Sequence, residues 1–178
     1  MSVYPIFARH VVLPIADKIM NTHICWDMNL LEKTQWWSKK DLNRYRDKKL
    51  KSLVNYAYRN VPFYHRIFRE RDLFPEDIKT KKDLTKLPII NKRVINENQK
   101  EFISKEIDKL TYFKLSTGGT TGSPLNYYLS SAAKSRLVAV KNRSLSWGGY
   151  NYGDRKVTLA GSSLVPNQKI GSLKKIRL

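Results

Sequence analysis

Residues 116–124, Ser-Thr-Gly-Gly-Thr-Thr-Gly-Ser-Pro, have the composition of a phosphate-binding loop. These nine residues include five hydroxyl side chains and three glycines. Glycine lets the backbone bring its N–H groups close to a ligand, and Ser and Thr hydroxyls donate hydrogen bonds to phosphate oxygens. The segment therefore predicts a polyphosphate-binding site. Its candidate contact residues are Ser116, Thr117, Gly118, Gly119, Thr120, Thr121, Gly122 and Ser123.

Two common phosphate-binding motifs do not fit this segment. The interval between Gly118 and Gly122 is one residue shorter than in a Walker loop, and no Gly-Lys-Ser or Gly-Lys-Thr follows it. The glycine spacing also differs from that of GxGxxG. The simplest alternative is a glycine-rich hairpin turn between Leu115 and Leu125. The hydroxyl content exceeds what a turn requires and favours the phosphate site.

The residues on either side of the loop predict strands. Residues 111–115 predict one strand and residues 125–129 a second, because both runs are rich in aromatic and aliphatic side chains. Residues 131 to about 147 then predict a helix, and residues 157–160 a further strand. All eight glycines of the chain lie from Gly118 onward. We therefore expect a mostly helical first part followed by an α/β part that bears the loop.

The strongest helical pattern covers residues 39 to about 60. Ser38 followed by Asp41 is typical of a helix N-terminus, and apolar residues then recur at helical spacing. Pro62 predicts a break, because the residue before a proline avoids the helical region. A second helical stripe follows at Tyr64, Ile67 and Phe68, so we expect two packed helices. Residues 82–87 and 92–99 are candidate short helices.

The loop and its flanks resemble the adenylate-forming superfamily, and the form Gly-Gly-Thr-Thr-Gly-Ser-Pro-Leu is similar to the phenylacetate-CoA ligase-like branch. That branch includes enzymes linked to capsular polysaccharide synthesis. The resemblance extends over residues 38–161. It includes the lead-in Ala-Tyr-Arg-Asn-Val-Pro-Phe-Tyr at residues 57–64, Asp83-Leu84, Leu87-Pro88-Ile89 and Lys92, and, after the loop, Trp147-Gly-Gly-Tyr150 and Gly153-Asp154-Arg155.

The resemblance implies an α/β fold in which residues 1–110 are a mostly helical lead-in. Residues 111–178 would be the start of a nucleotide-binding subdomain, with its first strands and phosphate loop, and both parts would belong to one incomplete N-terminal domain. Enzymes of this family use ATP with magnesium to convert a carboxylate to an acyl-adenylate, which a thiol such as coenzyme A then attacks. Thr120 and Thr121 would supply hydroxyl contacts, and Gly118, Gly119 and Gly122 backbone access. Leu125 stands where many members of the superfamily have Lys.

Other family motifs are expected beyond Leu178. These are the adenine-binding motif, the ribose-binding aspartate and the C-terminal lysine, so no catalytic residue is assigned here. We therefore expect an N-terminal portion of a ligase that is inactive alone, whose partners are ATP, an unidentified carboxylic acid and the remaining C-terminal part of the same enzyme. The alternative is a truncated remnant without activity.

The charge suggests another class of function. The chain has 34 basic and 15 acidic residues, and residues 111–178 carry 11 basic side chains against the single acid Asp154. Such a chain could bind nucleic acid or an anionic membrane. No nucleic-acid motif supports the first, and nucleic acid is not an expected partner. Residues 4–20 are aromatic and aliphatic enough to lie on a membrane, but Pro14 is expected to interrupt them and weaken such an anchor.

Several remaining residues are interpreted as structural. Cys25 is the only cysteine, and the three histidines have no zinc-ligand spacing. The longest apolar N-terminal run, residues 11–16, is too short to span a membrane, and no cleavable signal is visible. We therefore expect a cytoplasmic location, with peripheral contact to a membrane as the alternative. We expect His65 to be structural or exposed and Asp154 to be a turn residue. Trp36, Trp37 and Trp147 are expected to be packing residues.

Overall fold

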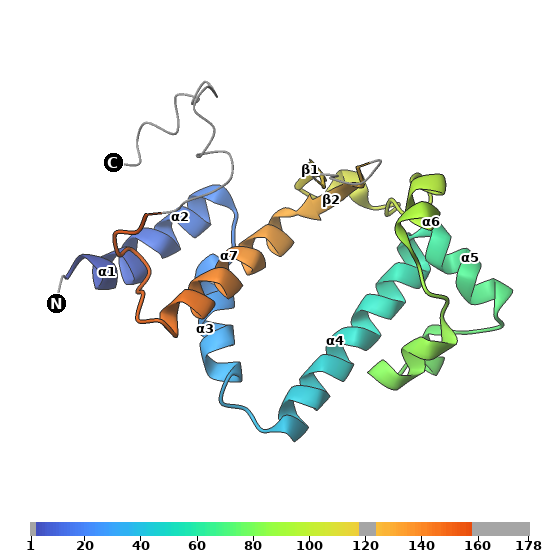
Figure 1. Cartoon of the computed structure of the whole chain (residues 1–178), viewed down its shortest axis with the longest axis horizontal. Helices are drawn as coiled ribbons and strands as arrows, with labels where there is room; N and C mark the ends of the chain where they lie inside the picture. The colour runs from blue at the N-terminus through green and yellow to red at the C-terminus, as the bar shows by residue number, and fades with distance from the viewer. Residues whose placement is uncertain (1–2, 118–123, 158–178) are drawn as a thin grey trace.

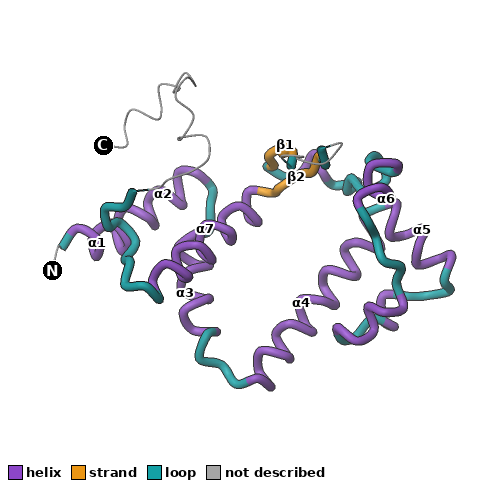
Figure 2. Tube along the Cα trace, viewed as in Figure 1, coloured by secondary structure: helices purple, strands orange, loops and turns teal. Residues whose placement is uncertain are grey.

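The computed structural model describes residues 3–117 and 124–157, which form a mostly helical structure with one small antiparallel sheet (Figures 1 and 2). The described part is thus mixed α/β. Helices α1, α2, α3 and α7 gather at one end, whereas α5 and α6 surround the far end of the long helix α4 (Figure 1). The described residues contain one small apolar core between α2, α3 and α7 and another between α4, α5 and the segment that follows α5.

The N-terminal residues form one continuous helical stretch. It consists of α1 (Tyr4–Phe7), a π-helical turn (Ala8–Val12) and α2 (Leu13–Met20). The expectation that Pro14 interrupts this stretch is wrong. The backbone N–H of Leu13 donates to the carbonyl of Ala8, five residues earlier, and this wider turn accommodates the proline that a regular helix would exclude.

Asp17 joins α2 to the beginning of α3 (Ile24–Thr34). Its carboxylate accepts hydrogen bonds from the Thr22 hydroxyl and from the backbone N–H groups of Ile24 and Cys25, at 3.1 and 2.7 Å for the two backbone donors. These backbone groups belong to the first turn of α3, so a side chain of the preceding helix caps it.

The first core lies between α2, α3 and α7 (Ser131–Ser146). Leu13, Met28 and Ala139 are buried there, one from each helix. Tyr152 packs against them from the segment that follows α7. Burial, with a smaller contribution from the charge of Asp17, raises the pKa of the Tyr152 hydroxyl.

Helix α4 (Lys39–Asn60) confirms the prediction for residues 39 to about 60. The Ser38 hydroxyl oxygen accepts the backbone N–H of Asp41 at 3.1 Å, as expected of an N-cap. Val61 is extended, and α5 (Pro62–Glu70) begins at Pro62, so the predicted break is also confirmed. His65 lies in α5, and its Nδ1 is 3.1 Å from the carbonyl oxygen of Tyr58, a structural contact.

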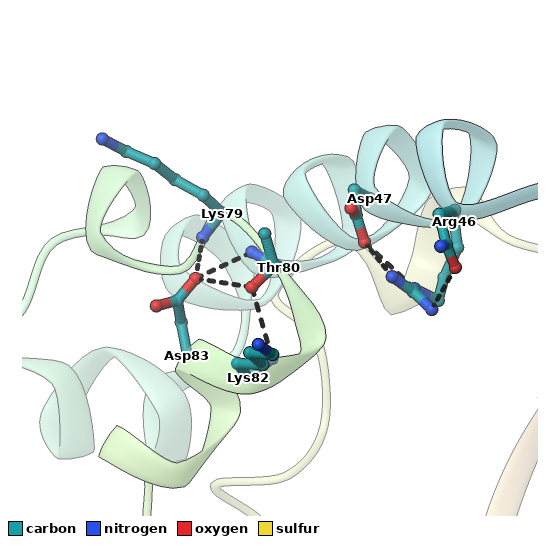
Figure 3. Close-up of polar contacts among 7 residues, drawn as sticks. Arg46, Asp47, Lys79, Thr80, Lys82 and Asp83 are labelled. Atoms are coloured by element: carbon teal, nitrogen blue, oxygen red, sulfur yellow. Dashed lines mark hydrogen bonds and ion pairs between the residues drawn. The ribbon is translucent and has the colours of Figure 1, made fainter. Parts of the chain in front are cut away.

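The second core joins α4 and α5 to two 3₁₀ turns, Pro75–Asp77 and Lys81–Lys86. Val54, Phe68 and Ile78 are its buried members. Asp83 holds the second turn in place: its Oδ2 accepts the backbone N–H groups of Lys79 and Thr80 and the Thr80 hydroxyl (Figure 3). These hydrogen bonds, those from Thr80 first, lower the pKa of Asp83.

Two backbone hydrogen bonds tie the following segment to the α4–α5 junction. Phe63 N–H donates to the Glu101 carbonyl at 3.0 Å, and Lys105 N–H donates to the Asn60 carbonyl at 2.7 Å. The rings of Phe63 and Phe102 stack with their centroids 4.1 Å apart. The segment contains α6 (Lys92–Glu97) and a 3₁₀ turn (Ile107–Lys109), and it leads the chain to the sheet.

The sheet is a hairpin of β1 (Tyr112–Ser116) and β2 (Asn126–Ser130), each one residue later than predicted. It leads directly into α7, which matches the predicted helix from residue 131. The strand expected at residues 157–160 lies outside the described residues except for Val157, which is not in a strand. Asp154 is confirmed as a turn residue, since its carboxylate accepts the Asn151 N–H at 2.6 Å.

The expectation that Trp36 and Trp147 are packing residues is wrong. Trp36 is 83% exposed and Trp147 68% exposed. Trp36 follows the end of α3 and Trp147 the end of α7, and neither belongs to the two cores of the described residues. The Trp147 indole N–H donates to the side chain of Gln35. Trp37 is more covered, and its ring meets that of Tyr45 edge-on.

Candidate phosphate-binding site

The predicted phosphate loop connects the two strands of the hairpin. The last strand pair is Ser116 opposite Asn126. Beyond it, Thr117 N–H donates to the Leu125 carbonyl at 3.0 Å, and Leu125 N–H donates to the Thr117 hydroxyl oxygen, also at 3.0 Å. Two of the predicted contact residues, Ser116 and Thr117, thus lie at the base of the loop, and both are exposed.

The other predicted contact residues, Gly118, Gly119, Thr120, Thr121, Gly122 and Ser123, lie outside the described residues. Thr117 has a role that the sequence did not indicate, because its hydroxyl oxygen closes the end of the hairpin. A hydroxyl oxygen that accepts one hydrogen bond can also donate its own hydrogen in another. Strand pairing of this kind is compatible both with a phosphate loop and with the simpler hairpin turn.

The beginning of α7 lies at the other end of the hairpin from the loop. Tyr112 pairs with Ser130 at that end, and Ser131 N–H donates to the Thr111 carbonyl at 2.8 Å. Ser116 is the last of the five residues of β1 and Tyr112 the first, and each step along an extended strand is about 3.3 Å. A phosphate at the loop would therefore be bound without the helix N-terminus that follows the loop in Walker and Rossmann sites.

One face of the hairpin is polar next to the loop. Side chains alternate along a strand, and directly paired residues share a face, so Lys114 and Ser116 lie on the same face as Asn126. Lys114 is exposed. Sequence reasoning missed Lys114 and Asn126, although the alternation of side chains along the predicted strands could have identified both.

The hairpin is only partly covered by the described residues. Tyr112, Phe113, Leu115, Tyr127 and Tyr128 are each between 37% and 40% exposed. Tyr112 and Tyr128 meet edge-on with centroids 5.3 Å apart, and the Lys134 ammonium lies 3.8 Å from the centre of the Phe113 ring. Lys134 is thus a second cation beside the hairpin, contributed by the first turns of α7.

Helix α7, which carries the hairpin, is fixed to α3 by an ion pair. Arg136 Nε and a terminal guanidinium nitrogen donate to Asp27 Oδ1 at 2.9 and 2.6 Å. Asp27 is 3% exposed, whereas the Arg136 side chain is 46% exposed. An open pocket beside this pair is also lined by His23, Trp26, Ala132 and Ala133, but it lies at the α7 end of the hairpin, away from the loop.

The described residues contain no cluster of three or more His, Cys, Asp or Glu side chains that could hold a metal ion. Within the same residues, every helix is too short or too polar to cross a lipid bilayer.

Two curated proteins are similar in sequence to this chain. Protein CapK of Staphylococcus aureus is 29% identical over 126 residues, which make up 71% of this chain and 27% of that protein. The phenylacetate-coenzyme A ligase of Aromatoleum evansii is 31% identical over 99 residues, 55% of this chain and 22% of that enzyme. The matched regions thus cover about a quarter of each relative. No protein-family model matches the chain. The similarities suggest a distant relation to that ligase family.

Proposed function

We propose that this chain supplies the phosphate loop and helical lead-in of an ATP-dependent, acyl-adenylate-forming ligase. The observation that carries the proposal is the hydroxyl- and glycine-rich segment 116–124 connecting two paired strands. The similarity to a phenylacetate-coenzyme A ligase supports the same assignment. The simpler hairpin turn would explain the pairing of the strands but not the five hydroxyl side chains.

The loop would bind the β- and γ-phosphates of ATP with its magnesium ion. Thr120 and Thr121 would donate their hydroxyl hydrogens to phosphate oxygens, and the glycines would let backbone N–H groups approach them. With the β- and γ-phosphates held in this way, a carboxylate oxygen would attack the α-phosphorus. Pyrophosphate would leave as the acyl-adenylate forms. Catalysis of this kind depends on positioning and on stabilising charge.

Leu125 stands where many members of the superfamily have a lysine. Lys114 would supply a positive charge near the loop in its place. Its side chain lies on the face of β1 that also carries Ser116, two residues before that last strand pair. A lysine there can approach a phosphate bound at the base of the loop. We therefore propose Lys114 as a phosphate-positioning residue rather than a catalytic one.

Acyl transfer to a thiol such as coenzyme A, and the identity of the carboxylic acid, would depend on further residues. The curated relatives are several times longer than the region that matches. We propose that this region binds nucleotide phosphate and that turnover requires the remaining parts of a complete ligase.

The test must separate specific binding from general attraction, because a chain with a net charge of +19 attracts any polyanion. Thr120→Val/Thr121→Val removes two hydroxyls and no charge. Thr85→Val, at an exposed threonine in a 3₁₀ turn, is the control. In a titration with ATP and magnesium at physiological salt, we expect the double variant to bind at least about tenfold more weakly, from the loss of two hydrogen bonds to charged groups.

The control should bind as the unmodified chain does. Equal affinity in the unmodified chain and both variants would mean that the hydroxyls contribute nothing and that binding reflects net charge. That result would contradict the proposed function.

A further inference from the structure

Basic side chains form a row along one side of helix α4, which runs between the two groups of helices (Figure 1). Five Lys and Arg residues of this helix follow one another at intervals of four, four, three and eight residues, so they lie on the same side of it. All five are exposed. We refer to them as the basic row: Lys40, Arg44, Lys48, Lys51 and Arg59.

The charge of the basic row is mostly unopposed. Among the residues that the structure describes, Arg44 is the only member of the row with an ion-pair partner, Asp41, at 3.4 Å. From Lys40 to Arg59 the helix rises about 28 Å, at about 1.5 Å per residue. The row is therefore long enough to follow an extended polyanion over several of its charges.

An open aromatic pocket lies beside the N-terminal half of the row. Trp37 and Tyr45 line it together with Asp41, Arg44 and Lys48, and its volume is about 320 Å³. The two rings meet edge-on, with 82° between their planes and centroids 5.7 Å apart. A flat ring in this pocket would meet aromatic side chains, and anionic groups attached to that ring would meet the two cations.

We propose that the basic row and this pocket bind single-stranded RNA, with phosphates along the row and a base in the pocket. Cations that follow the backbone and aromatic side chains that stack on bases are the two features by which proteins hold single strands. The carboxylate of Asp41 only accepts hydrogen bonds, and RNA supplies donors in its base N–H groups and ribose 2′-hydroxyls. The proposal is independent of the ligase assignment.

Other polyanions would use only part of this surface. In a duplex the bases are stacked inside and cannot enter the pocket. An anionic bilayer has phosphates but no flat ring to fill the pocket. The sequence contains no nucleic-acid motif, because the row exists only through the helical spacing of its members and the pocket only through the contact between Trp37 and Tyr45.

Fluorescence anisotropy of the full chain with a labelled oligouridylate of about 12 nucleotides tests the row. Lys48→Gln/Lys51→Gln removes two of its charges at little cost in helix propensity. Lys81→Gln/Lys82→Gln, at two exposed lysines of the second 3₁₀ turn, removes the same charge elsewhere. We expect the row variant to bind at least about fivefold more weakly and to reduce the salt slope by about 1.4, since each phosphate contact contributes about 0.7 for single strands. The control pair should change both quantities much less.

Trp37→Leu tests the pocket. Trp36→Leu is its control, because Trp36 is the neighbouring residue, is 83% exposed and is not among the residues that line the pocket. Loss of a stacked base should weaken RNA binding about tenfold in the Trp37 variant only. Inorganic polyphosphate has the charge but no bases, so it should bind both variants and the unmodified chain equally. This second measurement separates a lost base contact from damage to the fold.

Thr120→Val/Thr121→Val should bind the oligouridylate as the unmodified chain does. This variant separates the surface on α4 from the proposed phosphate loop, so failure of one proposal does not decide the other.

Three results would overturn the RNA proposal. One is an equal effect of the two lysine pairs, which would mean that net charge alone causes binding. Another is an equal effect of the two tryptophan variants on RNA binding. The third is binding of an RNA duplex, a single-stranded oligodeoxyuridylate or a polyglutamate peptide at least as tight as that of the oligouridylate, because the surface would then recognise a different partner.

Discussion

Arg136 and Asp27 form an ion pair between residues 109 positions apart in the chain. Arg136 lies in α7, directly after the hairpin, and Asp27 lies in α3. Both donating nitrogens of the guanidinium approach the same carboxylate oxygen. The pair fixes the helix that carries the proposed phosphate loop to the N-terminal helices.

Loss of Arg136 should destabilise the protein, because it leaves a buried carboxylate without its partner. Arg136→Gln is expected to lower the free energy of unfolding by about 2 kcal/mol, less than the 3–5 kcal/mol typical of fully buried pairs, since half of this arginine is in water. Chemical denaturation measures the change. Arg44→Gln, which breaks the exposed pair with Asp41, is the control and should change stability by less than about 0.5 kcal/mol.

The double variant Asp27→Asn/Arg136→Gln, measured together with Asp27→Asn and Arg136→Gln alone, completes a double-mutant cycle for this ion pair. Two amides can hydrogen-bond where the ion pair was, so the double variant should be more stable than the sum of the two single effects predicts. Strictly additive effects would mean that the two residues stabilise the protein independently.

Asp17 should be needed for the α2–α3 connection. Asp17→Ala removes the acceptor of two backbone N–H groups and one hydroxyl, and we expect a loss of about 2 kcal/mol or more in the free energy of unfolding. Hydrogen exchange should show faster exchange at Ile24 and Cys25. Asp108→Ala, at an exposed acid, is the control. Unchanged exchange at both amides would contradict the capping role.

Alanine substitutions at Gly149 and Gly153, two glycines with positive φ, distinguish the effect of backbone strain from that of a steric clash. Gly149→Ala, at φ +85° with nothing within 4 Å of the new Cβ, should cost about 1 kcal/mol from strain alone. Gly153→Ala, at φ +99°, must also displace the N-terminal helix, because its Cβ would lie 2.8 Å from that of Ala8. We expect a larger loss of stability and faster hydrogen exchange in α2 for Gly153→Ala only. Equal behaviour of the two variants would show that the helix does not pack there.

Asp83 should stabilise the second 3₁₀ turn only while it is charged. Hydrogen bonds from Thr80 and Lys79 lower its pKa, so folding favours the carboxylate. This stabilisation is complete above the ordinary aspartate pKa of about 4 and is lost as the pH falls through the lowered pKa. Asp83→Asn should therefore be less stable than the unmodified chain at neutral pH, and the difference should shrink in acid.

Denaturation curves measured between about pH 2 and pH 7 check this prediction. Asp108→Asn is the control. A difference between the Asp83 variant and the unmodified chain that stays constant with pH would show that the charge of Asp83 is not involved.

Local signals in the sequence predicted α4 accurately. Its first residue follows Ser38, whose hydroxyl caps it, and its last precedes the Val61-Pro62 break. The hairpin and α7 were also predictable, to within one residue, from apolar runs on either side of the glycine-rich loop. In these places neighbouring residues determine the local structure.

Features that depend on distant partners were not predictable. Nothing in the sequence indicates that Asp27 and Arg136 meet, and Pro14 predicted a break that the π-helical turn avoids. Trp36 and Trp147 were assigned to packing from residue type alone, which does not tell on which side of a helix a core will form. For the candidate site, the sequence predicted Ser116 and Thr117 near the hairpin end but missed the shared face of Lys114 and Ser116.

The most direct test of the proposed function is to map where ATP binds. An ATP analogue with a photoreactive group on its γ-phosphate, irradiated with the chain and magnesium and followed by peptide mass spectrometry, reports the residues nearest that phosphate. We predict that labelling concentrates between Lys114 and Leu125 and disappears when excess ATP is added. Labelling spread over the basic residues of α4, or labelling that ATP does not displace, would contradict a phosphate site at this loop.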